Sequence, residues 1–282
     1  ISLGLVGSEM CIRDRLNTTL WDTQSIYGSG SLGAAPTNAA SAMDNVWSAW
    51  GAQMNGQLVP QFDGVSRAYE YYDNKASFYE TGTTFSNTVS FSTAGDNGNT
   101  RFSLTNLDND DISPNSTLDR NSIGINTSQN VGKNIRIDAN LKYLLEDQSG
   151  NPRLSDGPGN ANWIINHTSP SVDVNWGKGP NGDGRNDDLS EFQMTPSIYI
   201  QNPWFAQNYY VNDSEKERFI GSINMRWDLT DWLYARARVG ADRYDLHRTQ
   251  SEPFGTGYKP KGGINHYKLS LIHISEPTRP RE

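Results

Sequence analysis

Two neighbouring runs of alternating apolar and polar residues constrain the fold of this chain more than any other feature. They occupy residues 215–244 and are separated by the short polar segment 228–231. Because successive side chains of a strand point to opposite faces, this pattern predicts a β-hairpin with one apolar and one charged surface. The apolar positions are Phe219, Gly221, Ile223, Met225 and Trp227 in the first run and Leu233, Ala235, Ala237, Val239 and Ala241 in the second.

The distribution of side chains over the two faces favours a membrane-spanning hairpin. Arg236, Arg238 and Asp242 share the face opposite the aliphatic residues, and Trp227 and Trp232 lie near the turn. Strands of about ten residues that are apolar outside and polar inside, with aromatic residues at the interfaces, are typical of transmembrane β-barrels. The segment therefore predicts two barrel strands.

A second segment, residues 133–143, alternates as regularly as the hairpin. Ile135, Ile137 and Leu141 fall on one face, whereas Arg136 and Asp138 fall on the other. Its length suits a tilted strand that crosses a bilayer. A basic group facing lipid at the midplane would cost about 2–4 kcal/mol, so we expect the apolar face to point outward.

The connections between expected strands alternate between short and long. Short turns are predicted at 96–98, 130–132 and 228–231, and longer connections at 108–119 and 146–212. With one strand between successive connections, all short turns fall at the same end, as barrels with short periplasmic turns and long extracellular loops require. We predict an all-β fold, an antiparallel meander forming part of a transmembrane β-barrel with long polar extracellular loops.

The two ends of the chain are expected to be foreign to the protein. Codons can be chosen for residues 5–15 whose reverse complement encodes residues 269–278, as if one library-preparation adapter had been read on both strands. We therefore interpret 1–15 and 269–282 as adapter-derived and 16–268 as the partial barrel. Cys11, the only cysteine, lies in the excluded part, so no disulfide is predicted.

Composition and motifs argue against several function classes. The net charge of −8 disfavours nucleic acid as a partner, and no run of about 20 apolar residues predicts a transmembrane helix. No GxSxG or HExxH motif is present, so we expect no enzyme and no cofactor. Residues 181–188 resemble part of a calcium loop, but Gly179 and Ser190 stand where acidic ligands belong, so no metal site is predicted.

A series of short motifs, taken in order, resembles the start of the barrel in SusC/RagA-type TonB-dependent outer-membrane transporters. Among them are residues 27–30 (YGSG), 48–51 (SAWG), 61–64 (QFDG), 74–82 (NKASFYETG) and 202–204 (NPW). The resemblance covers essentially all of 16–244. It implies an internal fragment of an outer-membrane importer that takes up glycan or peptide nutrients with a SusD-like surface lipoprotein. It also implies contact with outer-membrane lipid, and a TonB complex that engages an N-terminal part outside this fragment.

Aromatic residues in the longest connection are the candidate substrate-binding residues, because such rings stack on sugars beside hydrogen-bonding amides. The alternative for these rings is packing within the loops. The alternative for the whole chain is a secreted all-β carbohydrate-active enzyme or carbohydrate-binding module, whose apolar strand faces would meet a second sheet. The candidates are Trp163, Trp176, Trp204, Tyr209 and Tyr210.

Overall fold

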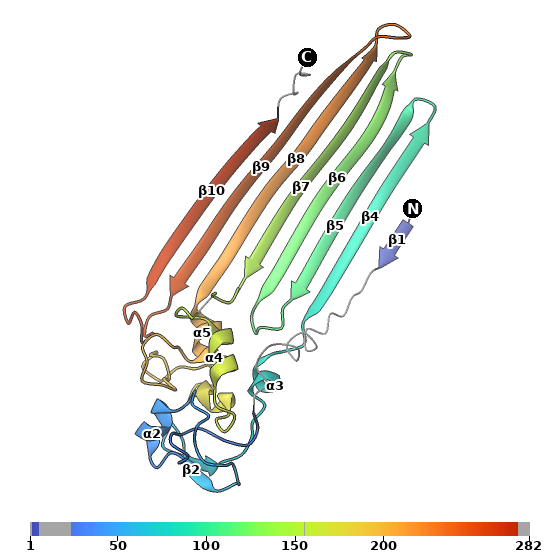
Figure 1. Cartoon of the computed structure of the whole chain (residues 1–282). Coiled ribbons are helices and arrows are strands. Elements are labelled where there is room, and N and C mark those ends of the chain that lie inside the picture. Colours follow the sequence, from blue (N-terminus) through green and yellow to red (C-terminus); the bar gives the residue numbers. More distant parts are fainter. Residues whose placement is uncertain (1, 6–23, 155, 276–282) are drawn as a thin grey trace.

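The computed structural model describes residues 2–5, 24–154 and 156–275. Within them, a long sheet extends from a compact unit of helices and loops (Figure 1). The strands are β1 (Ser2–Leu5), β2 (Leu58–Pro60), β3 (Ser66–Ala68), β4 (Thr83–Gly95), β5 (Gly98–Asp110), β6 (Thr117–Val131), β7 (Ile135–Ser149), β8 (Val211–Asp228), β9 (Tyr234–Glu252) and β10 (Gly263–Ser275). The helices are α2 (Ala39–Asp44), α3 (Asn74–Phe78), α4 (Ala161–His167), the 3₁₀ helix η1 (Val174–Lys178) and α5 (Pro203–Tyr209).

The strands β4 to β10 form an antiparallel meander in chain order, and β1 adds to its outer edge beside β4. Together they make an eight-stranded sheet in the described part of the chain. This arrangement confirms the predicted all-β antiparallel fold. Tight turns join β4 to β5, β6 to β7 and β8 to β9, so these pairs form at little entropic cost, whereas longer connections join the other pairs.

The two edge strands of the sheet, β1 and β10, contain residues that we expect to be adapter-derived. Strand β1 lies within 1–15, and β10 continues past position 268 to Ser275. Residues 6–23 lie outside the described residues, as do 276–282. The adapter origin of both ends stays a prediction.

All three predicted short turns lie at one end of the sheet, the upper end in Figure 1, and the long connections lie at the other. In the hairpin from which the prediction started, Trp227 pairs with Ala235 and Ile223 with Val239. The turn after β6 begins at Gly132, whose φ of +67° suits a residue without a side chain. The predicted alternation of connection lengths is confirmed.

Register places the apolar residues of neighbouring strands on one face of the sheet. Directly paired residues share a face, and Leu141 pairs with both Ile125 and Gly221. This apolar face is uncovered in the described structure, where Ile223 is 50% and Val239 58% exposed. Its other members include Phe91, Phe102, Leu104, Ile123, Ile135, Ile137, Tyr143, Phe219, Met225 and Trp227.

The apolar band covers only part of the length of the strands, and on β9 it ends at Ala241, because Arg243 follows on the same face opposite Phe219. From Ile135 to Leu145, β7 advances ten residues, or about 34 Å, which spans about 24 Å at a tilt of about 45°. Beyond Leu145 the same face carries a row of paired carboxylates, with Asp147 opposite both Asp119 and Glu215. On β7 the apolar run therefore has about the height of the lipid-facing band of an outer-membrane barrel, about 25 Å, whereas on β6 and β8 the band ends one pair earlier, since Asn121 and Glu217 lie opposite Leu145.

The opposite face of the sheet carries arginines and their acidic partners. Arg226 pairs in register with Arg136 and with Arg236, so three guanidinium groups lie in a row near the tight turns. Nearby acids compensate part of this charge: Arg136 lies 3.1 Å from Asp138, and Arg226 lies 2.8 Å from Asp228. Such a surface needs water or polar partners, because an unpaired charge in an apolar medium is costly.

The segment 146–212 is predicted as a long polar loop, but its ends belong to β7 and β8, and its described middle part, 150–154 and 156–210, contains helices and contributes to a core. Together with residues 24–80 and 253–262 it forms what we call the packed loop unit. Two clusters of buried side chains hold it together. One is Phe78, Ala161, Ile165, Val174, Phe205, Ala206 and Tyr210; the other is Val46, Phe62, Val172 and Met194.

Local sequence signals place the short helices of the packed loop unit. Asn202 caps α5, where its side-chain oxygen accepts a hydrogen bond from the Trp204 backbone N–H at 2.9 Å, and Pro203 occupies the first turn. Asn160 caps α4 in the same way. These helices are too short to be stable alone, so packing of their apolar sides against the core keeps them folded.

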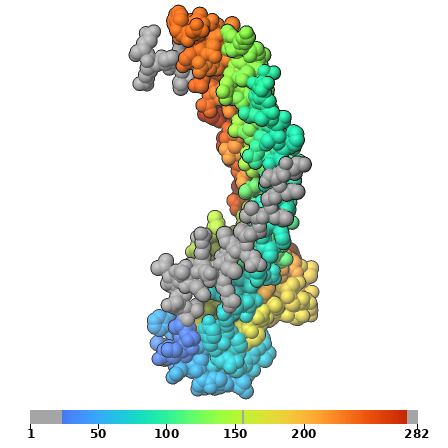
Figure 2. All heavy atoms as spheres, turned by 90° about the vertical axis from the view of Figure 1, so that its right-hand side faces the viewer, coloured from blue at the N-terminus to red at the C-terminus, as the bar shows by residue number. Residues whose placement is uncertain are grey.

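Viewed from the side, the sheet is a thin curved layer above the much thicker packed loop unit (Figure 2). The other sheet in the described residues is the two-stranded β2–β3 pair, which belongs to the packed loop unit. Among the helices that the structure describes, none combines the length and apolar character that crossing a membrane requires.

Candidate functional site

The five predicted aromatic residues all lie in the packed loop unit, and three of them are tryptophans held by neighbouring rings. Trp163 stacks on His167 with ring centroids 4.1 Å apart and meets the edge of Trp47. Trp176 contacts Tyr72 at 5.1 Å, and the Arg67 guanidinium lies over its ring. All three tryptophans stay partly exposed.

Trp204 is held by a hydrogen bond, a ring contact and a cation over its ring. Its indole N–H donates a hydrogen bond of 2.9 Å to the Val174 carbonyl, its ring lies 5.0 Å from Phe78, and the Lys178 ammonium sits over it at 4.3 Å. A ring with this many contacts inside the protein offers only part of its surface to a ligand.

The two tyrosines differ in exposure. Tyr209 is partly exposed, with the Arg185 guanidinium 3.2 Å from its ring centre and its hydroxyl bonded to Asp183. Tyr210 is only 6% exposed, and its hydroxyl lies 2.7 Å from the Thr256 hydroxyl. The fold places the five aromatic residues in one unit, but they do not line a common cavity. A substrate-binding role for them stays a prediction.

The calcium-like segment 181–188 uses its polar groups internally. The Asp183 side chain accepts a hydrogen bond from the Arg185 backbone N–H at 3.0 Å, and Asn181 donates one to the Arg185 carbonyl. Within the described residues, no group of three or more His, Cys, Asp or Glu side chains is arranged to hold a metal ion.

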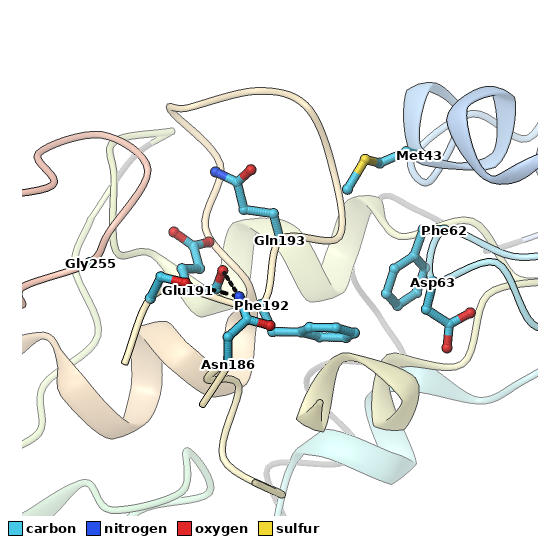
Figure 3. Close-up of a pocket in the computed structure, with 9 residues that line it drawn as sticks. Met43, Phe62, Asp63, Asn186, Glu191, Phe192, Gln193 and Gly255 are labelled. Atoms are coloured by element: carbon cyan, nitrogen blue, oxygen red, sulfur yellow. Dashed lines mark hydrogen bonds between the residues drawn. The ribbon is translucent and has the colours of Figure 1, made fainter. Parts of the chain in front are cut away.

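A cavity of about 470 Å³ opens in the packed loop unit between segments that are distant in sequence (Figure 3). Met43, Phe62 and Asp63 lie on one side of it, and Glu191 and Gly255 lie on the other. The remaining lining residues are Asn186, Ser190, Phe192 and Gln193. None of the five predicted aromatic residues lines this cavity.

Glu191 is the chemically unusual member of the cavity wall, because this acidic residue is only 4% exposed. It accepts hydrogen bonds from the backbone N–H groups of Asn202 at 2.6 Å and of Gly257 at 3.0 Å. Burial raises the pKa of Glu191 to about 7, although those bonds and one from the Thr256 hydroxyl favour the ionised form. No basic side chain in the described ranges forms an ion pair with it.

Glu191 makes the stability of the packed loop unit depend on pH. Because its pKa is higher in the folded than in the unfolded chain, its stabilising contribution is full below pH 4.5 and is lost as pH rises through about 7. We expect stability to fall by about 2 kcal/mol between pH 5.5 and 7.5. Thermal unfolding at several pH values, followed by tryptophan fluorescence, measures this loss. The variant Glu191→Gln should largely abolish the loss of stability with rising pH. The control variant Glu70→Gln, which changes an exposed acid in the same unit, should leave it unchanged.

Comparisons with known proteins find similarity in structure only. No family model and no curated protein matches the sequence. Among solved structures, a chain of the RagAB peptide importer in the closed-closed state matches with a TM-score of 0.57 and 14% identity over 89% of this chain. A chain of the same importer in the open-open state matches with a TM-score of 0.55 and 14% identity over 72% of this chain.

The matches relate the chain to a part of these larger proteins. It spans 31% of the closed-closed importer chain and 22% of the open-open one. At 14% identity the likeness concerns the path of the backbone rather than particular side chains. The protein described here therefore shares its fold with one part of chains of a RagAB peptide importer.

Proposed function

We propose that this chain is part of a SusC/RagA-type importer of the outer membrane, with a role in nutrient transport rather than catalysis. The observation that carries the proposal is the apolar band, which covers one face of the meander and ends at a row of carboxylates. A protein in water would leave this face exposed, whereas lipid would solvate it.

Both faces of the sheet support a position at the wall of a water-filled barrel. The apolar face would contact lipid, and the arginine-bearing face would contact water or polar groups in the interior. Tyr143 and Phe219, paired in register, lie near one boundary of the band, and Trp227 lies near the other. Aromatic residues at both boundaries are typical of outer-membrane strands.

The alternative of a secreted carbohydrate-active enzyme or binding module receives less support. A sandwich requires a second sheet over the apolar side chains. In residues 24–154 and 156–275, the only further sheet is the small β2–β3 pair.

The proposed transport activity belongs to a larger protein than this chain. We infer import of peptide or glycan nutrients, driven by a TonB complex and assisted by a SusD-like lipoprotein. The likeness to chains of a peptide importer supports peptides as one substrate class. The packed loop unit, at the end with the long connections, is the part of this chain that we expect to meet the substrate and to carry the five predicted aromatics.

Quenching of tryptophan fluorescence by brominated lipid tests the membrane assignment. Trp227 and Trp232 are 46% and 81% exposed near the tight turns, whereas Trp163 and Trp204 lie in the packed loop unit. For the chain in vesicles, we expect most of the quenching to disappear in Trp227→Phe/Trp232→Phe. The matched variant Trp163→Phe/Trp204→Phe should keep it. A chain that stays monodisperse in water, and whose fluorescence the lipid does not quench, contradicts the proposal.

A further inference from the structure

The cavity beside Glu191 has the size of a binding site for a small group. Its volume of about 470 Å³ falls within the range of about 300–1,000 Å³ that ligand sites occupy. Its wall comes from α2, from the loop after β2, from residues 186–193 and from Gly255 in the connection between β9 and β10. The tertiary fold alone creates this cavity.

The two sides of the cavity differ in chemistry. Met43 and Phe62 present apolar surface, and the Phe62 ring meets the Phe192 ring edge-on at 6.0 Å. Glu191 supplies a carboxylate on the other side (Figure 3). An amphipathic ligand, apolar along its length and charged at its end, matches this distribution.

Two carboxylates line the cavity, but only one of them lacks a cationic partner within the part of the chain that the structure describes. The Arg67 guanidinium binds both oxygens of Asp63, at 2.7 and 2.6 Å, in a bidentate pair. Among the described residues, Glu191 receives hydrogen bonds only from two backbone N–H groups and a hydroxyl. An ionised carboxylate has about four lone-pair positions, so Glu191 can accept at least one further donor.

A buried carboxylate without a cation is costly, and a ligand that brings a positive charge offsets that cost. A neutral sugar would supply hydrogen bonds but would leave the charge uncompensated. A primary ammonium is a compact charge on a flexible apolar stem, so it suits a cavity with a carboxylate on one side and Met43 and Phe62 on the other.

We propose that this cavity binds a primary ammonium group on an apolar stem, as in the lysine side chain of a peptide, with the Glu191 carboxylate as its partner. The identification of the ligand as an imported peptide rests on the proposed function. The binding site itself does not, because it follows from the cavity and its charge.

Two peptides that differ only in the charged group test the proposal on the unmodified chain. Acetyl-Gly-Lys-Gly-amide carries the ammonium, and acetyl-Gly-norleucine-Gly-amide replaces it with a methyl group of similar reach. By calorimetry on the full chain in detergent micelles, we expect the lysine peptide to bind at least tenfold more tightly. Equal binding of both peptides, or binding of neither, overturns the proposal.

Matched variants test whether the Glu191 carboxylate causes the difference in affinity between the two peptides. Glu191→Gln should abolish the difference between the peptides, whereas Glu70→Gln should retain it. If Glu191→Gln keeps the tenfold difference, or if Asp63→Asn removes it while Glu191→Gln does not, the assignment to Glu191 is wrong. Should Glu191→Gln fail to fold, the peptide pair on the unmodified chain still decides. Failure of peptide binding would leave the lipid-quenching result, and with it the proposed function, intact.

Discussion

Replacing Phe205 by alanine is expected to destabilise the packed loop unit by about 3–5 kcal/mol. Phe205 is fully buried in α5, where it joins Phe78, Val174 and Tyr210 in the larger core cluster. Its ring also lies 5.4 Å from Tyr209. Truncation removes these contacts and leaves a cavity, since the short helices around it are anchored from several sides and collapse only in part.

Denaturant unfolding followed by tryptophan fluorescence measures this loss, because Trp163, Trp176 and Trp204 report on the packed loop unit. Leu154→Ala is the matched control. Leu154 is 85% exposed in the same connection, so its truncation should change stability by less than about 0.5 kcal/mol. Equal effects of the two variants would show that the core around Phe205 does not form.

Replacing Ile223 by arginine is expected to destabilise the membrane-bound sheet by about 2–4 kcal/mol. Ile223 lies in the middle of the apolar band, paired with Ala139 on one side and Val239 on the other. A guanidinium at this position lies between the apolar side chains of Ala139 and Val239 near the middle of the bilayer, so it must be desolvated or must distort the lipid around it.

The neighbouring residue provides the control for this variant. Ser222 points to the opposite face, where it pairs with Asn140 and with Gly240, which leaves room for a longer side chain. Ser222→Arg should therefore cost little. Urea unfolding of the two variants in phospholipid vesicles compares them directly. A larger loss for Ser222→Arg than for Ile223→Arg would mean that the two faces have been assigned the wrong way round.

Much of the sheet could be predicted from the sequence because its signals are local. Alternation over residues 133–143 and 215–244 predicts both the strands and the face that each side chain takes. The turn signals predict which neighbours pair, and the observed register of Trp227 with Ala235 agrees with them. The strands extend beyond the predicted segments, as in β7, which continues to Ser149. Polar strand ends carry no apolar periodicity, and pairing with their neighbours keeps them extended.

The candidate site could be predicted only in part. The aromatic residues of the long connection were found by residue type, but their partners lie far away in the chain: Trp47 for Trp163, and Tyr72 for Trp176. Glu191 was missed altogether. Nothing in its immediate sequence distinguishes it from an exposed acid such as Glu70, because its burial depends on Asn202 and Gly257, which the fold brings to it.

The sequence by itself determined the all-β meander, the two unlike faces of its strands and the common end of its tight turns. Each of these follows from the two-residue period of a strand and from the conformations that turn residues permit. Only the tertiary structure decided that the long polar connection packs around a core, that a cavity opens between Phe62 and Glu191, and that no described basic side chain pairs with this carboxylate. The physical reason is that burial and charge compensation depend on residues far apart in the chain, whose contacts no local pattern records.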